Sequence, residues 1–321
     1  MRYFLALLIA CAASLLAYLI LFGVLVSRPL VIDQVRDFMD RKLAYADSTP
    51  HPKIFVVAGS NARFSHSCAV LESALHRPCI NMGIHADAAL DWTFDTLRGR
   101  LAAGDLVYMP IEYDLYSRTR LQMMTGMDAA YRFRHDKASL AVRGPEGMVR
   151  AAFMFSLPTL VQSLGEMGLQ AAGVHRRFNL DTLDRQGDET GHDGAKAIPY
   201  RDVIAQAREE LPDITGVLSH PDGAQQTIAD FLDWARGRGV IAVGGLPTIF
   251  DDRPVPDASI AALKIFYARH GADFLVLQNR SQYPRDDFYD TGSHLRQSAA
   301  EAHSRLLAQA LRPLLDRRAA P

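Results

Sequence analysis

The chain has 321 residues, of which 49% are apolar and 22% are charged. This excludes a disordered protein and leaves room for one large α/β domain or two small ones. Its 35 basic and 36 acidic residues give a formal net charge of −1, whereas a nucleic-acid-binding protein would show a basic excess. With 3 cysteines it is neither a disulfide-stapled mini-domain nor a multi-cysteine zinc protein. We therefore expect a globular protein that binds no nucleic acid.

An uncharged stretch of the chain runs from Phe4 to Val26. A helix of this length can cross a hydrocarbon core of about 30 Å, so we predict an uncleaved transmembrane anchor over residues 1–28. Two alternatives stay open. A cleaved signal peptide would have a shorter apolar run and a small-x-small cleavage site. A lipoprotein is suggested only by Leu8–Cys11, which resembles a lipoprotein cleavage box.

Residues 29–52 are expected to form an amphipathic juxtamembrane segment that ends in a polar linker, and a domain over residues 53–321 follows it. Short apolar runs in this domain predict five strands, over residues 54–57, 78–83, 105–111, 240–243 and 274–277. Helical patterns cover residues 64–76, 88–101, 225–236 and 258–270, and a last helix starts near residue 298. This alternation predicts an α/β fold with a parallel sheet covered on both faces.

Two features interrupt or end the alternation. Residues 115–219 break it, and we interpret them as a mainly helical insertion that caps or flanks the sheet, with a mobile polar loop over residues 181–202. In the last helix, Ser298 and Glu301 are expected to form a capping box. Pro313 should end or kink that helix near Leu311.

Three polar blocks lie where predicted strands end or where the last helix begins: Gly59-Ser60-Asn61, Asn81-Met82-Gly83 and Asp290–His294. In an open parallel sheet, ligands bind beyond the carboxyl ends of the strands. A serine, a histidine and an aspartate at such an edge indicate nucleophilic acyl transfer, because the serine needs a base and the histidine needs a carboxylate to fix its tautomer. Gly59 leaves Ser60 exposed on a tight turn, and Gly83 lets a backbone N–H approach a developing oxyanion.

The order of these blocks resembles the SGNH, or GDSL-like, hydrolase superfamily over about residues 53–114 and 220–315. Together with the N-terminal apolar helix, they resemble its membrane-anchored subgroup, which includes alginate acetylation proteins and the lipoteichoic-acid D-alanylation protein. The resemblance implies a three-layer α/β/α fold with a flavodoxin-like parallel sheet. It also implies Ser60 as the nucleophile, His294 as the base and Asp290 as the acid that orients the base. The expected oxyanion donors are Ser60, Gly83, Asn81 and Asn61.

The sequence departs from the family pattern at two places. The third strand ends in Pro110–Asp114 and lacks the Gly-x-Asn-Asp block, whose asparagine donates to the oxyanion. Loss of one such donor can lower the rate by about 10²–10³. Three residues separate Asp290 from His294, where many relatives have two. Asp286 and Asp287 are interpreted as solvated loop charges.

Other side chains are open to two interpretations. Glu112, Tyr113 and Arg63 either line the pocket or form an ordinary ion pair, and His66 and His85 are either structural or in contact with the substrate. No His-x-x-x-His or Cys-x-x-Cys spacing occurs, so we expect no metal site and no cofactor.

The two later cysteines, Cys68 and Cys79, fall on a predicted helix and strand that pack together in one βαβ unit. A disulfide between them is geometrically plausible and fits an oxidising compartment. Two buried thiols are the alternative.

Three functions stay open. The first is an anchored acyltransferase, with acetyl as the expected group, that modifies an extracytoplasmic polysaccharide through an acyl-serine. For this function the resemblance implies a polytopic membrane-bound O-acyltransferase as partner. The second is a carbohydrate esterase with the same triad, and the third is a catalytically weak module that binds polysaccharide or scaffolds a synthase complex. The anchor favours the first over the second, and the cysteines favour a body on the periplasmic side of the inner membrane.

Overall fold

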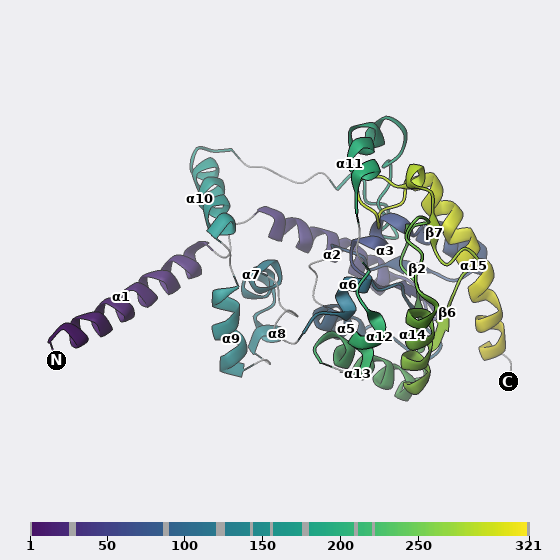
Figure 1. Cartoon of the computed structure of the whole chain (residues 1–321), viewed down its shortest axis with the longest axis horizontal. Helices are drawn as coiled ribbons and strands as arrows, with labels where there is room; N and C mark the ends of the chain where they lie inside the picture. Colours follow the sequence, from purple (N-terminus) through teal and green to yellow (C-terminus); the bar gives the residue numbers. More distant parts are fainter. Residues whose placement is uncertain are drawn as a thin grey trace. The chain divides into compact units, whose positions relative to one another are not determined.

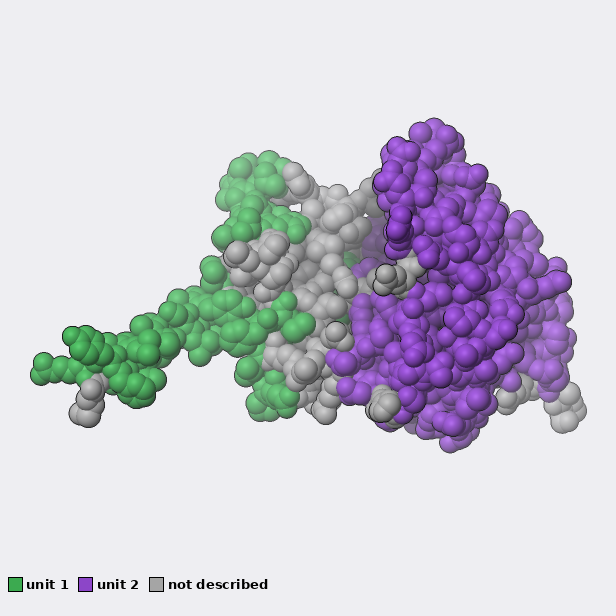
Figure 2. All heavy atoms as spheres, in the orientation of Figure 1, with its two compact units in different colours: residues 1–37, 124–179 green, residues 38–123, 180–321 purple. Residues whose placement is uncertain are grey.

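The computed structural model describes residues 2–25, 30–85, 90–119, 126–141, 144–154, 157–174, 180–208, 211–219 and 222–319. The chain forms two compact units, shown in different colours in Figure 2. The first, which we call the anchor unit, comprises Met1–Asp37 and Met124–Asn179. The second, which we call the sheet unit, comprises Phe38–Met123 and Leu180–Pro321.

The sheet unit is built on a five-stranded parallel sheet in the order β2-β1-β3-β4-β6. Figure 1 labels β2 and β6 of this sheet. The strands are β1 (Ile54–Val56), β2 (Cys79–Asn81), β3 (Leu106–Met109), β4 (Ile241–Gly245) and β6 (Asp273–Leu275). All five lie where the apolar runs predict them, so the α/β class with a parallel sheet is confirmed. A separate parallel pair joins β5 (Ile249–Phe250) to β7 (Gln282–Tyr283).

Helices of the sheet unit pack against this sheet. One core cluster joins the strand residues Ile54, Val56, Leu106 and Val243 to α4 and α15, while α13 contacts α5 and β4, and α14 contacts β6. The helices, including the 3₁₀ helices η1 and η2, are α3 (Ser60–Ser65), α4 (Cys68–Leu75), α5 (Leu90–Arg98), α6 (Tyr113–Tyr116), η1 (Gly194–Tyr200), α11 (Arg201–Gln206), α12 (Ile214–Ser219), α13 (Ala224–Gly237), α14 (Asp257–Arg269), η2 (Arg285–Asp287) and α15 (Gln297–Ala319).

The single helix expected over residues 64–76 is two helices, α3 and α4. The backbone is extended at His66 and Ser67, which ends α3. Ser67 then caps α4, because its side chain accepts a hydrogen bond from the backbone N–H of Val70 at 3.3 Å.

The last helix also differs from its prediction. It begins at Gln297, so Ser298 lies inside it, and the N–H of Ser298 donates to the carboxylate of Asp193 instead of completing a capping box. It continues through Pro313 to Ala319. Three leucines on the two sides of the proline are buried in the core, Leu311, Leu314 and Leu315. Their packing outweighs the loss of the hydrogen bond that proline removes.

The anchor unit contains α1 (Arg2–Leu25), the first part of α2 (Leu30–Ser48), α7 (Gly126–His135), α8 (Lys137–Ala141), α9 (Gly144–Phe153) and α10 (Leu157–Ala171). Among the described residues, one helix is long and apolar enough to cross a membrane, over Arg2–Leu21. Of the insertion expected over residues 115–219, residues 124–179 belong to this unit and residues 180–219 to the sheet unit.

Two segments that the sequence presents as linker or loop form part of the sheet unit. The second half of α2 buries Phe38, Met39 and the whole side chain of Lys42. Lys42 Nζ donates to the carbonyls of Asn81 and Gly187 at 2.7 and 2.6 Å. The polar residues 181–202, expected to be mobile, include 3₁₀ helix η1 and bury the side chains of Asp188 and His192.

Candidate active site

Ser60 is the first residue of α3 and follows β1 after a turn of three residues. It is half-buried and lines a cavity of about 290 Å³ at the carboxyl end of the sheet. The backbone N–H groups at the start of a helix have no intrahelical acceptor, and the Ser60 N–H makes no hydrogen bond to the described part of the chain. Ser60 therefore presents both a hydroxyl and an unpaired N–H at this edge.

A buried carboxylate holds the turn around Ser60. The two Glu112 side-chain oxygens accept hydrogen bonds from the backbone N–H groups of Gly59 and Asn61, each at 2.9 Å. Glu112 is 7% exposed, and burial raises its pKa. Both oxygens act as acceptors, which is the pattern of an ionised carboxylate. The sequence left open whether Glu112 lines the pocket or forms an ion pair; in the structure it lines the cavity and also holds the serine turn.

His294 and Asp290 lie together, as the sequence predicts. Nδ1 of His294 is 2.6 Å from Oδ1 of Asp290. Because a carboxylate only accepts, Nδ1 carries a proton, and in the neutral ring Nε2 is then the nitrogen with the lone pair. The imidazole is buried and stacks on Phe64 of α3, with the ring centroids 4.3 Å apart. Nε2 is buried and has no hydrogen-bond partner among the residues that the structure describes, so Ser60 Oγ and His294 Nε2 are not hydrogen-bonded.

Helix α3 brings Ser60 and His294 close to each other. Ser60 and Phe64 are four residues apart, so they lie on the same face of the helix, one turn from each other. His294 packs on Phe64, and Ser293, the residue before it, lines the cavity with Ser60. The base and the serine therefore lie at neighbouring turns of one helix face.

One backbone carbonyl fixes the loop that carries His294. The carbonyl of Ser293 accepts hydrogen bonds from Asn61 Nδ2 at 2.8 Å, from Ser65 Oγ at 2.8 Å and from Thr248 Oγ1 at 3.1 Å. The backbone N–H of Leu295 also donates to Ser65 Oγ at 2.9 Å. The sequence carries no distinctive signal for Ser65 or Thr248, because a serine in a helix and a threonine after a strand are both common.

The three further expected oxyanion donors are engaged within the protein. The Gly83 N–H donates to Asn81 Oδ1 at 3.0 Å. Asn81 Nδ2 donates to the carbonyl of Ala62 at 2.7 Å and to Asp188 at 2.8 Å. Asn61 Nδ2 donates to Thr248 and to Ser293.

Gly83 has a steric role at the same place. A Cβ atom there would lie 2.4 Å from the backbone nitrogen of Arg63 and 2.8 Å from the carbonyl oxygen of Gly59. Only glycine therefore fits between the end of β2 and the start of α3.

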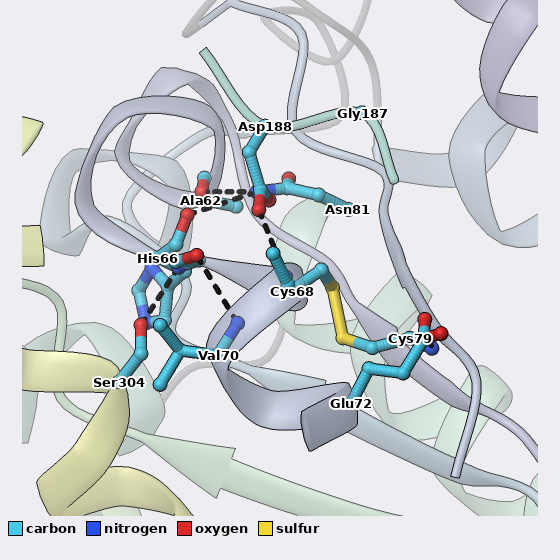
Figure 3. The surroundings of a disulfide bond; sticks show 12 residues. Ala62, His66, Cys68, Val70, Glu72, Cys79, Asn81, Gly187, Asp188 and Ser304 are labelled. Carbon is cyan, nitrogen blue, oxygen red and sulfur yellow. Dashed lines mark hydrogen bonds between the residues drawn. A yellow bond between two sulfur atoms is a disulfide. The ribbon is translucent and has the colours of Figure 1, made fainter. Parts of the chain in front are cut away.

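A disulfide joins Cys68, the first residue of α4, to Cys79, the first residue of β2 (Figure 3). It is the pair that the sequence suggests, with Cα atoms 5.0 Å apart. Figure 3 also shows Asn81 reaching Asp188 and Ala62 beside the bond. The disulfide and this hydrogen-bond cluster together tie β2 to the helices that follow β1.

The segment after residue 180 adds further groups around His294. Glu189 pairs with Arg63, and His192 Nε2 lies 3.1 Å from the carbonyl oxygen of Phe64. The His192 and Phe64 rings pack edge to face, and burial lowers the pKa of His192. The pattern of this polar segment gave no signal that it would contact α3.

His66 belongs to a buried chain of hydrogen bonds rather than to the cavity. Its Nε2 lies 3.2 Å from Nε2 of His303, whose Nδ1 lies 2.8 Å from the hydroxyl of Tyr283. Burial lowers the pKa of His66 to about 4. This supports the structural interpretation of His66 that the sequence left open.

Comparison with known proteins adds no match, whether with family models, with curated proteins or with solved structures. Within the residues that the structure describes, no group of three or more His, Cys, Asp or Glu side chains could hold a metal ion. The interpretation of the site therefore depends on its own geometry.

Proposed function

We propose that this chain is a membrane-anchored acyltransferase of the SGNH-like kind, which transfers an acyl group such as acetyl to an extracytoplasmic polysaccharide. One observation carries the proposal: the hydrogen bond between His294 and Asp290, which leaves a buried, unpartnered Nε2 beside the helix that begins at Ser60. A histidine held in this tautomer is the base that a serine nucleophile requires.

In the proposed reaction, Ser60 Oγ attacks the carbonyl carbon of the donor ester or thioester and His294 Nε2 takes its proton. The bond to the leaving group breaks, and His294 returns the proton to that group, which leaves an ester on Ser60. A sugar hydroxyl then attacks the ester carbonyl and loses its proton to His294. The bond between Ser60 Oγ and the acyl carbon breaks, His294 returns the proton to Ser60 Oγ, and the acylated sugar departs. The Ser60 N–H is the donor available to the developing oxyanion.

Other features support the proposed class and location. The strand order β2-β1-β3-β4-β6 has the form of the flavodoxin-like order, as expected for a three-layer SGNH-like fold. A disulfide is typical of an oxidising compartment. With the apolar helix α1, it supports a single-pass protein of the inner membrane with its body in the periplasm. A polytopic membrane-bound O-acyltransferase is the proposed donor partner.

The test uses the full-length protein in detergent, an aryl acetate and mass spectrometry of the serine peptide. Acetyl should accumulate on Ser60, and Ser60→Ala should abolish both the adduct and turnover. His294→Ala should lower turnover as much as Ser60→Ala does. The double variant should lower turnover no more than either single variant, because the two groups act as a unit. Asp290→Asn should lower turnover less than either of these substitutions. Ser293→Ala is the matched control, since Ser293 lines the same cavity but uses its carbonyl.

One observation favours a second candidate, the catalytically weak polysaccharide-binding or scaffold module. Ser60 and His294 are not hydrogen-bonded, and the expected donors Gly83, Asn81 and Asn61 are engaged. Normal polymer acylation in cells that carry Ser60→Ala would favour this candidate. Aryl-ester turnover without any polymer acylation would instead indicate an esterase that uses water as acceptor.

A further inference from the structure

The helices of the anchor unit expose several large apolar side chains, although a small apolar cluster of Ala129, Leu140, Ala151 and Ala152 is buried between them. The exposed large apolar residues of α9 and α10 are Met148, Val149, Phe153, Val161 and Leu164. Polar side chains are buried in the same unit, Asp128 and Arg132 on α7 and Ser163 on α10. In α10, a helix of 15 residues, Glu166 is the single charged residue. A surface of this kind is suited to an apolar environment.

This surface is continuous with α1. The hydroxyl of Tyr18 on α1 donates to the carbonyl of Ala152 on α9 at 2.6 Å. Its ring stacks on Phe153, with the centroids 5.2 Å apart and an angle of 9° between the planes. α1 also contacts α10. The exposed residues of α9 and α10 therefore lie beside the C-terminal part of the helix that can cross a membrane.

The position of Tyr18 along α1 indicates how deep in the bilayer its contacts on α9 would lie. Tyr18 precedes Leu25, the last residue of α1, by seven positions, or about 10 Å along the helix at 1.5 Å per residue. The 24 residues of α1 span about 36 Å, a few ångströms more than a hydrocarbon core of about 30 Å. Interfacial helices bury their apolar face about 5–10 Å below the headgroup boundary. The contact with Tyr18 would place Phe153 at that depth.

We propose that α9 and α10 form a lipid-binding surface, which lies in the bilayer interface beside α1 with Val149, Phe153, Val161 and Leu164 among the acyl chains. The partner is the lipid bilayer itself. The residues that would enter the bilayer are apolar, so the surface requires acyl chains rather than a particular headgroup. This inference depends on α1 as a membrane helix and not on the acyl-transfer chemistry of Ser60.

The test measures where single labels lie in full-length protein reconstituted in phosphatidylcholine vesicles. Cys11, the exposed free cysteine, is first replaced by serine, and Val149→Cys and Val161→Cys then carry an environment-sensitive fluorophore. Val203→Cys is the matched control. It is the same residue type with nearly the same exposure, 56% against 60% for Val149 and 59% for Val161, but it belongs to α11 of the sheet unit.

Labels at positions 149 and 161 should lose fluorescence to nitroxide-bearing lipids and resist aqueous iodide, and the label at 203 should do the opposite. Equal quenching by iodide at all three positions would overturn the proposal. Labels at 149 and 161 that resist both quenchers would also overturn it, since a second copy of the chain would then cover the surface. Two labelled positions on two helices guard against a local defect at either one.

Discussion

The carboxylate of Glu112 gives the sharpest prediction, because it holds the serine turn through hydrogen bonds from two backbone N–H groups. Glu112→Gln keeps the shape of the side chain but leaves one oxygen. One of the two N–H groups, on Gly59 or Asn61, then faces an amide NH₂ instead of an acceptor. A hydrogen bond to a charged group contributes about 1.5–3 kcal/mol, and a buried donor without an acceptor costs about 1–3 kcal/mol. We expect the free energy of unfolding to fall by about 3 kcal/mol.

The assay is urea unfolding of the detergent-solubilised full-length chain, together with the rate at which a fluorophosphonate labels Ser60. Both the unfolding midpoint and the labelling rate should fall. Asp114→Asn is the control, because Asp114 lines the same cavity but its side chain is 63% exposed and lies 3.9 Å from Arg118, so its loss should change stability by less than about 0.5 kcal/mol. A Glu112→Gln protein with the midpoint of the unaltered chain would refute the assignment of an ionised, turn-holding carboxylate.

Two further predictions concern stability. Burial lowers the pKa of His66 to about 4. Between about pH 6.5 and pH 4 the unfolded chain therefore binds a proton that the folded chain does not. The free energy of unfolding falls by about 3 kcal/mol as the pH is lowered through this range. His66→Gln should remove this contribution. The readout is the difference in urea midpoint between the two proteins at pH 7 and pH 5, because burial raises the pKa of Asp188 to about 7 and acts in the opposite direction over this range. The Cys68–Cys79 disulfide closes a loop with a sequence separation of 11. Its replacement by two serines should therefore lower stability by about 3 kcal/mol in urea unfolding, whereas Cys11→Ser should not.

The strands could be predicted because they are short apolar runs with clear boundaries, and β1, β2 and β3 are buried along their whole length. The helix boundaries were harder to predict. The break at His66 and Ser67 depends on a cap that forms only once the chain turns, and the passage of α15 through Pro313 depends on leucines that meet the core of α4. Both are cases in which tertiary packing outweighs a local preference.

The residue types of the candidate site could be predicted, but their hydrogen bonds could not. A serine after a strand and an Asp–His pair before a helix are recognisable by type and order. Asn61 and Asn81 look like equally good donors in the sequence, yet both turn their amides toward backbone carbonyls. The convergence of three donors on the carbonyl of Ser293 joins α3, the loop after β4 and the histidine loop, and no local pattern encodes it.

The engaged donors bear directly on the choice between an enzyme and a scaffold. The Ser60 N–H has no hydrogen-bond partner in the described part of the chain, whereas the Gly83 N–H donates to Asn81 Oδ1. Release of the Gly83 N–H from Asn81 removes a hydrogen bond of about 1 kcal/mol and leaves a buried acceptor without a donor, at a cost of about 1–3 kcal/mol. A second oxyanion donor, in turn, lowers the barrier of the reaction by about 3 kcal/mol. The two magnitudes are comparable, so the release becomes favourable only once negative charge develops on the substrate. A tetrahedral transition-state analogue should therefore bind more tightly than an ester of the same size, and a scaffold should bind the two equally.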